Sequence, residues 1–117
     1  MRRDRLYLSD IIEAADEIEE FLNGVSRDEF LKNKLIRAAV LQKLTTIGEA
    51  SARLSDDFRK RHTEVAWADI VGFRNIAVHA YFSVEWSIVW TAATEDAPSL
   101  RDQISKIIET DFSKDDR

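Results

Sequence analysis

Hydrophobic residues recur at three- and four-residue steps along most of the chain, a spacing that is typical of amphipathic α-helices. Residues 8–22 carry one such stripe with acidic residues between its positions, and an Asn-Gly pair at 23–24 predicts its end. A capping-box pattern at residues 26–29 predicts a new helical start. The stripe over residues 35–54 then predicts the longest helix, with a break near Asn33.

The second half of the chain predicts three more helices. One covers residues 67–81, and another covers residues 84–94 with Ser83 as its cap. The last begins after residue 96 or 97, has Pro98 in its first turn and carries an apolar stripe up to Ile108.

The composition agrees with a helical protein. With three Gly and one Pro among 117 residues, the chain has too few turn-forming residues for a β-sandwich or barrel. Hydrophobic residues (44%) are too frequent for a disordered chain, and charged residues (33%) too frequent for a membrane protein. We therefore expect one all-α domain over residues 1–117, an antiparallel bundle of four to five helices with an ordered core at about 4–109 and a polar, frayed tail at 110–117.

Several features point to the cytoplasm. The longest run without a charged residue, 75–84, is too short to span a bilayer. The N-terminal residues lack the apolar stretch of a secretory signal, and the absence of Cys weakly favours a reducing compartment. We expect a cytoplasmic protein that does not contact a membrane.

The net charge of −5 hides a strong asymmetry along the chain. Residues 30–63 carry eight basic and three acidic side chains, whereas the segments on either side are acidic. Arg59, Lys60 and Arg61 form a compact basic tract within residues 55–63, a stretch predicted to be a short exposed helix or a loop. This tract is either a solvated run of charges or a contact for RNA phosphates, and the neighbouring His62 is expected to be exposed and non-catalytic.

The helix predicted at residues 67–81 is apolar on two sides. Its core face is predicted to hold Ala66, Ile70, Phe73, Ile76, Ala77 and Ala80. The opposite face carries Arg74, Asn75, His79 and Tyr81, with Trp67, Val71 and Val78 among them. A helix that is apolar on nearly all sides is normally covered on all sides, so we expect a homodimer with this helix at its interface.

The polar residues of this helix suit phosphate chemistry. The Arg74 guanidinium can hold a phosphate through two hydrogen bonds, the His79 imidazole can transfer a proton near neutral pH, and Asn75 can orient either group. Two His and no Cys give poor support for a bound transition metal, so we predict neither a metal nor a cofactor. The alternative is a structural or surface histidine within an ordinary helix.

The run from Arg74 to Tyr81 resembles the R-x4-H-x-Y motif of HEPN-superfamily ribonuclease toxins of the HepT type. The resemblance extends over roughly residues 5–109 and includes the order of the helices. Further matching features are the Ile-Gly-Glu-Ala sequence at 47–50, Trp67 with Ile70 and Gly72, and Trp90 followed by Pro98 and Leu100. Thr63 and Ala66 stand in a connection where relatives often have prolines.

The resemblance implies a HEPN-like fold and a metal-independent endoribonuclease of a type II toxin-antitoxin pair, with one composite cleft across the dimer axis. His79 would be the general base or acid, Arg74 would stabilise developing charge and Asn75 would support them. Tyr81 occupies the position at which a nucleotidyltransferase antitoxin attaches AMP to silence the nuclease. RNA would be the substrate and this antitoxin the partner.

Two rival interpretations remain open for the whole chain. One is a non-catalytic helical module that serves as the partner subunit of a nucleotidyltransferase, and the other is a purely structural dimerising bundle.

Within the leading interpretation, Glu49 is either a solvated helix residue or a partner that holds Arg74. Gly48 is predicted to allow close packing of another helix, and Trp67, Trp86 and Trp90 to be core or interface anchors.

Overall fold

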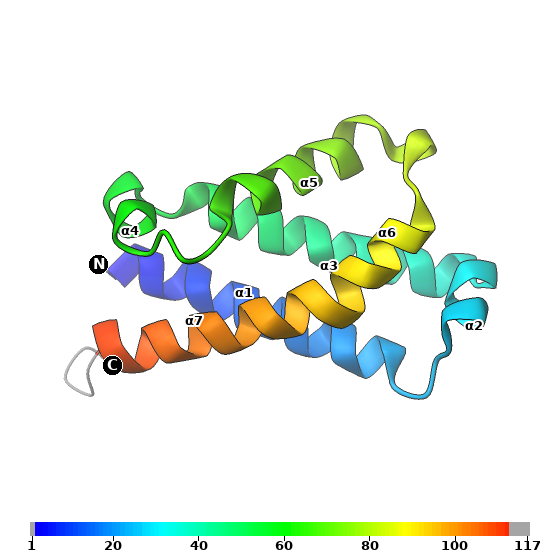
Figure 1. The fold of residues 1–117 in the computed structure, drawn as a ribbon, viewed down its shortest axis with the longest axis horizontal. Helices are drawn as coiled ribbons and strands as arrows, with labels where there is room; N and C mark the ends of the chain where they lie inside the picture. Colours follow the sequence, from blue (N-terminus) through cyan, green and yellow to red (C-terminus); the bar gives the residue numbers. More distant parts are fainter. Residues whose placement is uncertain (1, 113–117) are drawn as a thin grey trace.

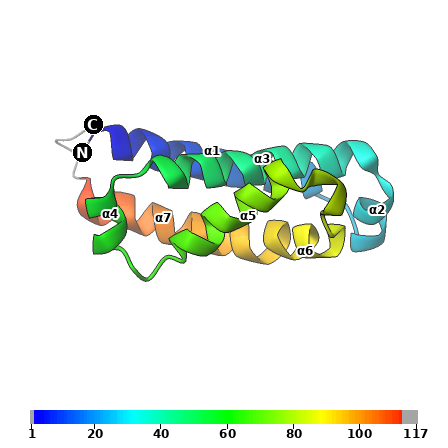
Figure 2. The ribbon, with the colours of Figure 1, turned by 90° about the horizontal axis from the view of Figure 1, so that it is seen from above.

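Four longer helical segments lie side by side along the molecule, and two short helices connect them at its ends (Figures 1 and 2). The structure is a computed structural model and describes residues 2–112; within them every regular element is helical. The elements are α1 (Arg2–Leu22), α2 (Arg27–Lys32), α3 (Lys34–Arg53), α4 (Asp56–Arg61), α5 (Trp67–His79), a 3-10 turn (Tyr81–Ser83), α6 (Trp86–Thr91), a π-turn (Ala92–Asp96) and α7 (Ala97–Asp111). The predicted all-α bundle is confirmed.

The boundaries between the first three helices lie where the local signals predicted, although α1 begins at Arg2, before the predicted stripe at residues 8–22. Gly24 has a φ of 76°, the left-handed conformation that a glycine adopts readily after a helix. Ser26 and Glu29 form the complete capping box of α2. Asn33 ends α2 and caps α3 by accepting a hydrogen bond from the backbone N–H of Ile36.

The core lies where α1 packs against α3 and α7, and α3 packs against α5. Leu8, Ile11, Phe30 and Val40 are fully buried there. Leu35, predicted to face the core, is instead 80% exposed, because it lies in the first turn of α3 at the end of the bundle. The prediction that residues 35–54 form the longest helix is also wrong by a small margin, since α1 has 21 residues and α3 has 20.

The last helices form one continuous rod in place of two separate segments. The predicted start of the last helix, after residue 96 with Pro98 in its first turn, is confirmed. The expected gap before it is absent, because the π-turn joins α6 to α7 without a break. Pro98 has no N–H to donate to a helical hydrogen bond, and its ring crowds the carbonyl four residues earlier. The π-turn just before α7 is wider than an α-helical turn and so makes room for the proline. Ser83 ends the 3-10 turn and does not cap α6, which begins after Glu85.

The C-terminal end of α7 is ordered further than its polar sequence suggested. The helix continues to Asp111, and Phe112 is buried, so fraying from Thr110 is wrong for residues 110–112. Residues 113–117 of the predicted tail lie outside the described residues. Among the described helices, none has the length and apolar character needed to cross a membrane.

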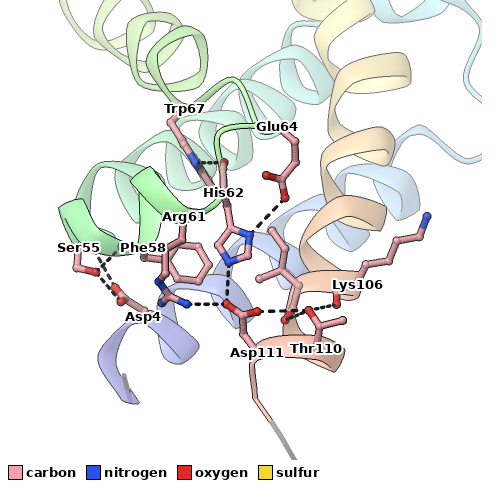
Figure 3. A network of polar contacts seen from close by, with 11 residues as sticks. Asp4, Ser55, Phe58, Arg61, His62, Glu64, Trp67, Lys106, Thr110 and Asp111 are labelled. Atoms are coloured by element: carbon pink, nitrogen blue, oxygen red, sulfur yellow. Dashed lines mark hydrogen bonds and ion pairs between the residues drawn. The ribbon is translucent and has the colours of Figure 1, made fainter.

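A polar network ties the N-terminal end of α1, α4 and the end of α7 together (Figure 3). The buried Asp4 carboxylate accepts hydrogen bonds from the Ser55 backbone N–H (2.9 Å) and hydroxyl (2.8 Å). Asp111 lies 2.7 Å from His62 Nε2 and accepts a hydrogen bond from Arg61 (3.1 Å). Three segments that are distant in sequence are thereby fixed at one end of the bundle.

His62 is part of this network, and the prediction that it is exposed is wrong. Its side chain is only 12% exposed, and its ring stacks on Phe58 at 4.6 Å between centroids. Its two ring nitrogens face the carboxylates of Asp111 and Glu64. The ring is covered because α4 turns its Phe58 and His62 side chains toward the core and α7.

The pKa of Asp111 lies below its ordinary value of 3.8. Burial alone would raise it, but the hydrogen bond with His62 and the charges of His62 and Arg61 outweigh burial. A carboxylate whose pKa is lower in the folded than in the unfolded chain stabilises the fold above its unfolded pKa. That stabilisation is lost as the pH falls through the folded pKa.

We expect Asp111→Asn to lower the free energy of unfolding by about 2 kcal/mol at pH 7, because charged hydrogen bonds are lost. In urea unfolding measured from pH 7 to pH 3, the difference from wild type should shrink below about pH 4. The exposed Glu109→Gln on the same helix is the matched control and should change stability little. A deficit for Asp111→Asn that is equal at pH 7 and pH 3 would contradict this assignment.

Candidate functional site

Arg74 occupies the point where α5 crosses closest to α3. A Cβ atom added to Gly48 of α3 would lie 2.3 Å from Arg74 Cβ and 2.9 Å from Arg74 Cγ. Only a glycine lets the two helices approach this closely, since no real Cβ contact is that short. The prediction that Gly48 permits close helix packing is therefore confirmed, and the residue that it accommodates is Arg74.

Glu49, the next residue on α3, holds the Arg74 guanidinium. Arg74 Nη1 donates a hydrogen bond to Glu49 Oε1 at 3.2 Å, and the side chains are 21% and 44% exposed, respectively. Of the two roles left open for Glu49, the structure shows that of the Arg74 partner. Arg74 Nε is buried and has no hydrogen-bond partner among the described residues. The guanidinium is thus anchored at one nitrogen and unsatisfied at another.

His79 and Tyr81 lie at the end of α5, away from this anchor. His79 is the last residue of the helix and is exposed, as is Asn75. The helix does not continue to Tyr81 as predicted, because Ala80 leaves the helical region (φ −131°, ψ 41°) and a 3-10 turn follows. The Tyr81 ring packs edge-on against Phe82 (5.6 Å) and Trp86 (6.3 Å), while its side chain stays accessible.

Arg74 and His79 do not converge within one chain. Five residues along an α-helix correspond to about 140° of rotation and roughly 7.5 Å of rise, so the two side chains leave α5 in different directions. No hydrogen bond joins them in the part of the chain that the structure describes. The described residues therefore show the two groups on different sides of α5 with no hydrogen bond between them.

Large apolar side chains are exposed around the end of α5. We call this surface the α5–α6 apolar patch; it consists of Ile76, Val78, Tyr81, Phe82 and Ile88. Phe82 is fully exposed in the single chain. A cluster of this kind is typical of a protein interaction surface.

The predicted faces of α5 need correction. Ile76 is 58% exposed and Ala66 is also exposed, so neither belongs to the core face, whereas Trp67, placed on the opposite face, is buried. The cause is geometric: α5 runs obliquely over α3, so the covered side changes from one end of the helix to the other (Figure 2). Of the apolar residues predicted for the second face, Val78 is exposed, Val71 is half-buried and Trp67 is buried. The large apolar side chains that α5 exposes are Ile76 and Val78, both in its C-terminal half.

The basic tract is far from these residues. It lies on α4, and Figures 1 and 2 place α4 at the opposite end of the long axis from the α5–α6 connection. Arg59 pairs with Asp56 (2.7 Å) and Arg61 with Asp111 (3.1 Å). Two of the three positive charges of the basic tract are thus compensated. An RNA contact by Arg59, Lys60 and Arg61 stays a prediction.

A hollow of about 360 Å³ lies between α3, α5 and α7, and none of the predicted site residues lines it. Its walls are largely apolar, with Phe73 and Leu100 among them and the carboxylates of Asp69 and Asp96 also contributing. Within residues 2–112, no group of three or more His, Cys, Asp or Glu side chains is arranged to hold a metal ion.

Comparison with known proteins matches residues 11–107 to the family described as Ribonuclease HepT-like. A Methanocaldococcus jannaschii protein named "Putative RNase" is 38% identical over 104 residues, covering 88% of this chain and 95% of the relative. The "Probable ribonuclease HepT" of Thermococcus cleftensis is 38% identical over 106 residues, covering 91% and 96%. A "Putative RNase" of Caldanaerobacter subterraneus subsp. tengcongensis is 32% identical over 109 residues, covering 93% and 97%. The search of solved structures found no match.

We expect Gly48→Ala to lower the free energy of unfolding by about 2 kcal/mol, because the new methyl group overpacks the contact with Arg74. Gly72→Ala on α5 is the matched control: its methyl group meets nothing within 4 Å and should stabilise the helix by up to about 1 kcal/mol. Urea unfolding gives the free energy of unfolding of both variants and of the wild type. Equal effects of the two substitutions would show that the α3–α5 contact is not tight at Gly48.

Proposed function

The chain belongs to the HepT-like ribonuclease family, and on this basis we propose that it is an RNA-cleaving toxin whose active site forms when two copies associate through α5. The observation that carries the proposal is the arrangement of α5 itself. The helix presents an anchored arginine and an exposed histidine, the turn that follows it presents an exposed tyrosine, and apolar side chains are uncovered around them.

A dimer solves two problems of the single chain at once. It would cover the α5–α6 apolar patch, whose exposure is unfavourable in water. It would also bring His79 of one copy toward Arg74 of the other, which one helix cannot do by itself. The site would then be composite, with two motif copies facing each other across the dimer axis.

The proposed reaction uses the RNA 2′-hydroxyl as the nucleophile. His79 removes its proton, the 2′-oxygen attacks the adjacent phosphorus, and the bond from phosphorus to the 5′-oxygen breaks. The leaving 5′-oxygen takes up a proton, and the other product carries a 2′,3′-cyclic phosphate. Arg74 stabilises the negative charge that develops on the phosphate, and Asn75 supports both groups as a polar neighbour. Proton transfer and charge stabilisation come from side chains, so we propose that no metal ion takes part.

We propose that a nucleotidyltransferase antitoxin silences the nuclease by attaching AMP to Tyr81. The accessibility of the Tyr81 side chain supports this role, since the hydroxyl must reach another enzyme's active site. The added phosphate would place negative charge beside the site where an RNA phosphate must bind, and the adenosine would obstruct it. The rival function, a non-catalytic partner subunit of such an enzyme, would need Tyr81 but not His79.

We expect His79→Ala to lower the rate of RNA cleavage at least 100-fold, because the general base is lost. The assay uses unmodified protein expressed without a partner, total RNA and a chelator, and circular dichroism verifies that the variant is folded. Wild-type protein that is dimeric and folded but does not cut RNA would favour the partner-subunit interpretation.

The same assay tests the composite site. Arg74→Ala and His79→Ala should each be inactive alone, whereas co-expression of the two should restore part of the activity, because a mixed dimer pairs one intact Arg74 with one intact His79. Light scattering checks that both variants remain dimers. Mixed dimers without activity would place both residues in the same protomer's site.

We expect co-expression with the cognate nucleotidyltransferase to add AMP to Tyr81, as measured by peptide mass spectrometry. Tyr81→Phe should escape neutralisation and remain toxic, since the phenol oxygen that accepts the AMP is missing. Tyr7→Phe on α1 changes the other tyrosine of the chain and is the matched control. A neutralised complex in which Tyr81 carries no AMP would contradict the proposal.

A further inference from the structure

The corner between α2 and α3 carries cations that the rest of the chain leaves uncompensated. Residues 30–48 contain no acidic residue, and their basic residues are Lys32, Lys34, Arg37 and Lys43. Lys43 pairs with Glu17 at 3.0 Å, while the other three form no ion pair with the described residues. We call Lys32, Lys34 and Arg37 the α2–α3 cation corner.

Arg37 is the fixed member of this corner. Its guanidinium lies over the Trp86 ring, with Cζ 4.9 Å from the ring centroid, and Nη1 donates a hydrogen bond to the Leu31 carbonyl (2.8 Å). Arg37 Nε is buried without a hydrogen-bond partner among the described residues. A half-buried cation with no carboxylate beside it is costly for a fold, and a bound anion removes the cost. Lys34 lies one turn before Arg37, so both face the same side of α3.

Trp86 connects this corner to the tyrosine of the motif. Its ring contacts Arg37 on one side and packs edge-on against Tyr81, with 6.3 Å between the ring centroids. Figures 1 and 2 show α2, the start of α3 and the α5–α6 connection together at one end of the bundle. The corner is therefore at the same end of the bundle as His79, the last residue of α5, and Tyr81 in the turn that follows.

The basic tract on α4 differs from the α2–α3 cation corner in its ion pairs and in its distance from the motif. Two of its three cations are neutralised by Asp56 and Asp111, and it lies at the other end of a molecule that is 46 Å long. The fold thus places the basic residues of the middle segment at both ends of the bundle. Among the described residues, two of the three cations of the α4 tract form ion pairs, whereas none of the three in the α2–α3 cation corner does.

We infer that the α2–α3 cation corner is the surface that holds the RNA backbone. Arg37, oriented by Trp86, binds a phosphate that neighbours the cleaved one, and Lys32 and Lys34 bind phosphates further along the same single strand. This inference rests on the proposed function, because it names the part of the protein that holds the substrate of that same site.

The test is binding of a fluorescein-labelled single-stranded RNA whose riboses are all 2′-O-methylated, so that the nucleophile is blocked and no cutting occurs. Fluorescence anisotropy gives its Kd over a series of salt concentrations. We expect Lys32→Ala/Lys34→Ala to weaken binding about tenfold and to lower the salt slope by about 1.4, since each phosphate contact on single strands contributes about 0.7. Arg37→Met, which keeps an apolar stem over Trp86 but removes the charge, should weaken binding as well.

The matched control is Arg53→Ala/Lys106→Ala, which removes two exposed cations from the α4 end of the bundle. Arg53 is the last residue of α3, just before α4, and Figure 3 shows Lys106 beside the α4 network. Its affinity should stay within about twofold of wild type, because no phosphate contact is lost. Circular dichroism and light scattering verify that every variant is folded and has the wild-type oligomeric state. Losses of equal size in Lys32→Ala/Lys34→Ala and in the control variant would overturn the inference, since only the overall charge would then matter.

Two further outcomes separate this inference from the proposed function. If wild-type protein neither binds nor cuts RNA, the proposed function fails and the inference fails with it. If wild-type protein cuts RNA and the corner variants bind the probe as wild type does, only the inference is overturned. Loss of antitoxin binding by those variants would then identify the corner as a protein-docking surface.

Discussion

The approach of α3 and α5 at Gly48 is the constraint on which the site depends. Because no side chain separates the helices there, the Arg74 stem is pressed against the α3 backbone and its guanidinium comes within reach of Glu49. The contact thus determines two things together: the angle at which α5 leaves the bundle and the position of its one arginine. A looser contact would release Arg74 from Glu49 and change the direction in which His79 and Tyr81 project.

This geometry leaves the single chain incomplete. Arg74 is half-buried with one nitrogen unsatisfied, while His79, five residues later, points into solvent from another side of the helix. The apolar side chains of the α5–α6 apolar patch surround the same region without cover. Association through this surface is the simplest event that would bury the apolar area and assemble the polar groups, which is why we treat dimerisation and catalysis as one proposal.

Local signals in the sequence predicted the elements whose causes are local. The capping box of α2, the left-handed Gly24 and the helix boundary at Asn33 each depend on a few neighbouring residues, and each is confirmed. Gly48 also showed its role through its cost in a helix. These helix boundaries and the helical spacing of hydrophobic residues were sufficient to predict the fold class.

Features that depend on tertiary packing could not be predicted from the sequence. A helical wheel assumes that one side of a helix is covered along its whole length, so it misplaced Ile76 and Trp67 on the oblique α5. His62 seemed an ordinary member of a charged run, since its partner Asp111 is 49 residues away. Of the candidate site, the motif residues and the Arg74 partner were available from the sequence. The position of Arg37 beside Trp86 was not, because it depends on how α2 and α6 meet.

The inferred role of the α2–α3 cation corner explains how an acidic protein would hold RNA. With a net charge of −5, most of the surface repels a polyanion, so binding requires cations that no carboxylate of the protein neutralises. The fold pairs two of the three cations of the α4 tract with carboxylates, whereas those of the α2–α3 cation corner form no ion pair within residues 2–112. Their position beside Trp86 and Tyr81 also bears on regulation. A phosphate attached to Tyr81 would add negative charge to a ring that packs against Trp86, the same residue over which Arg37 lies, so silencing by repulsion of the substrate would require no change in the fold.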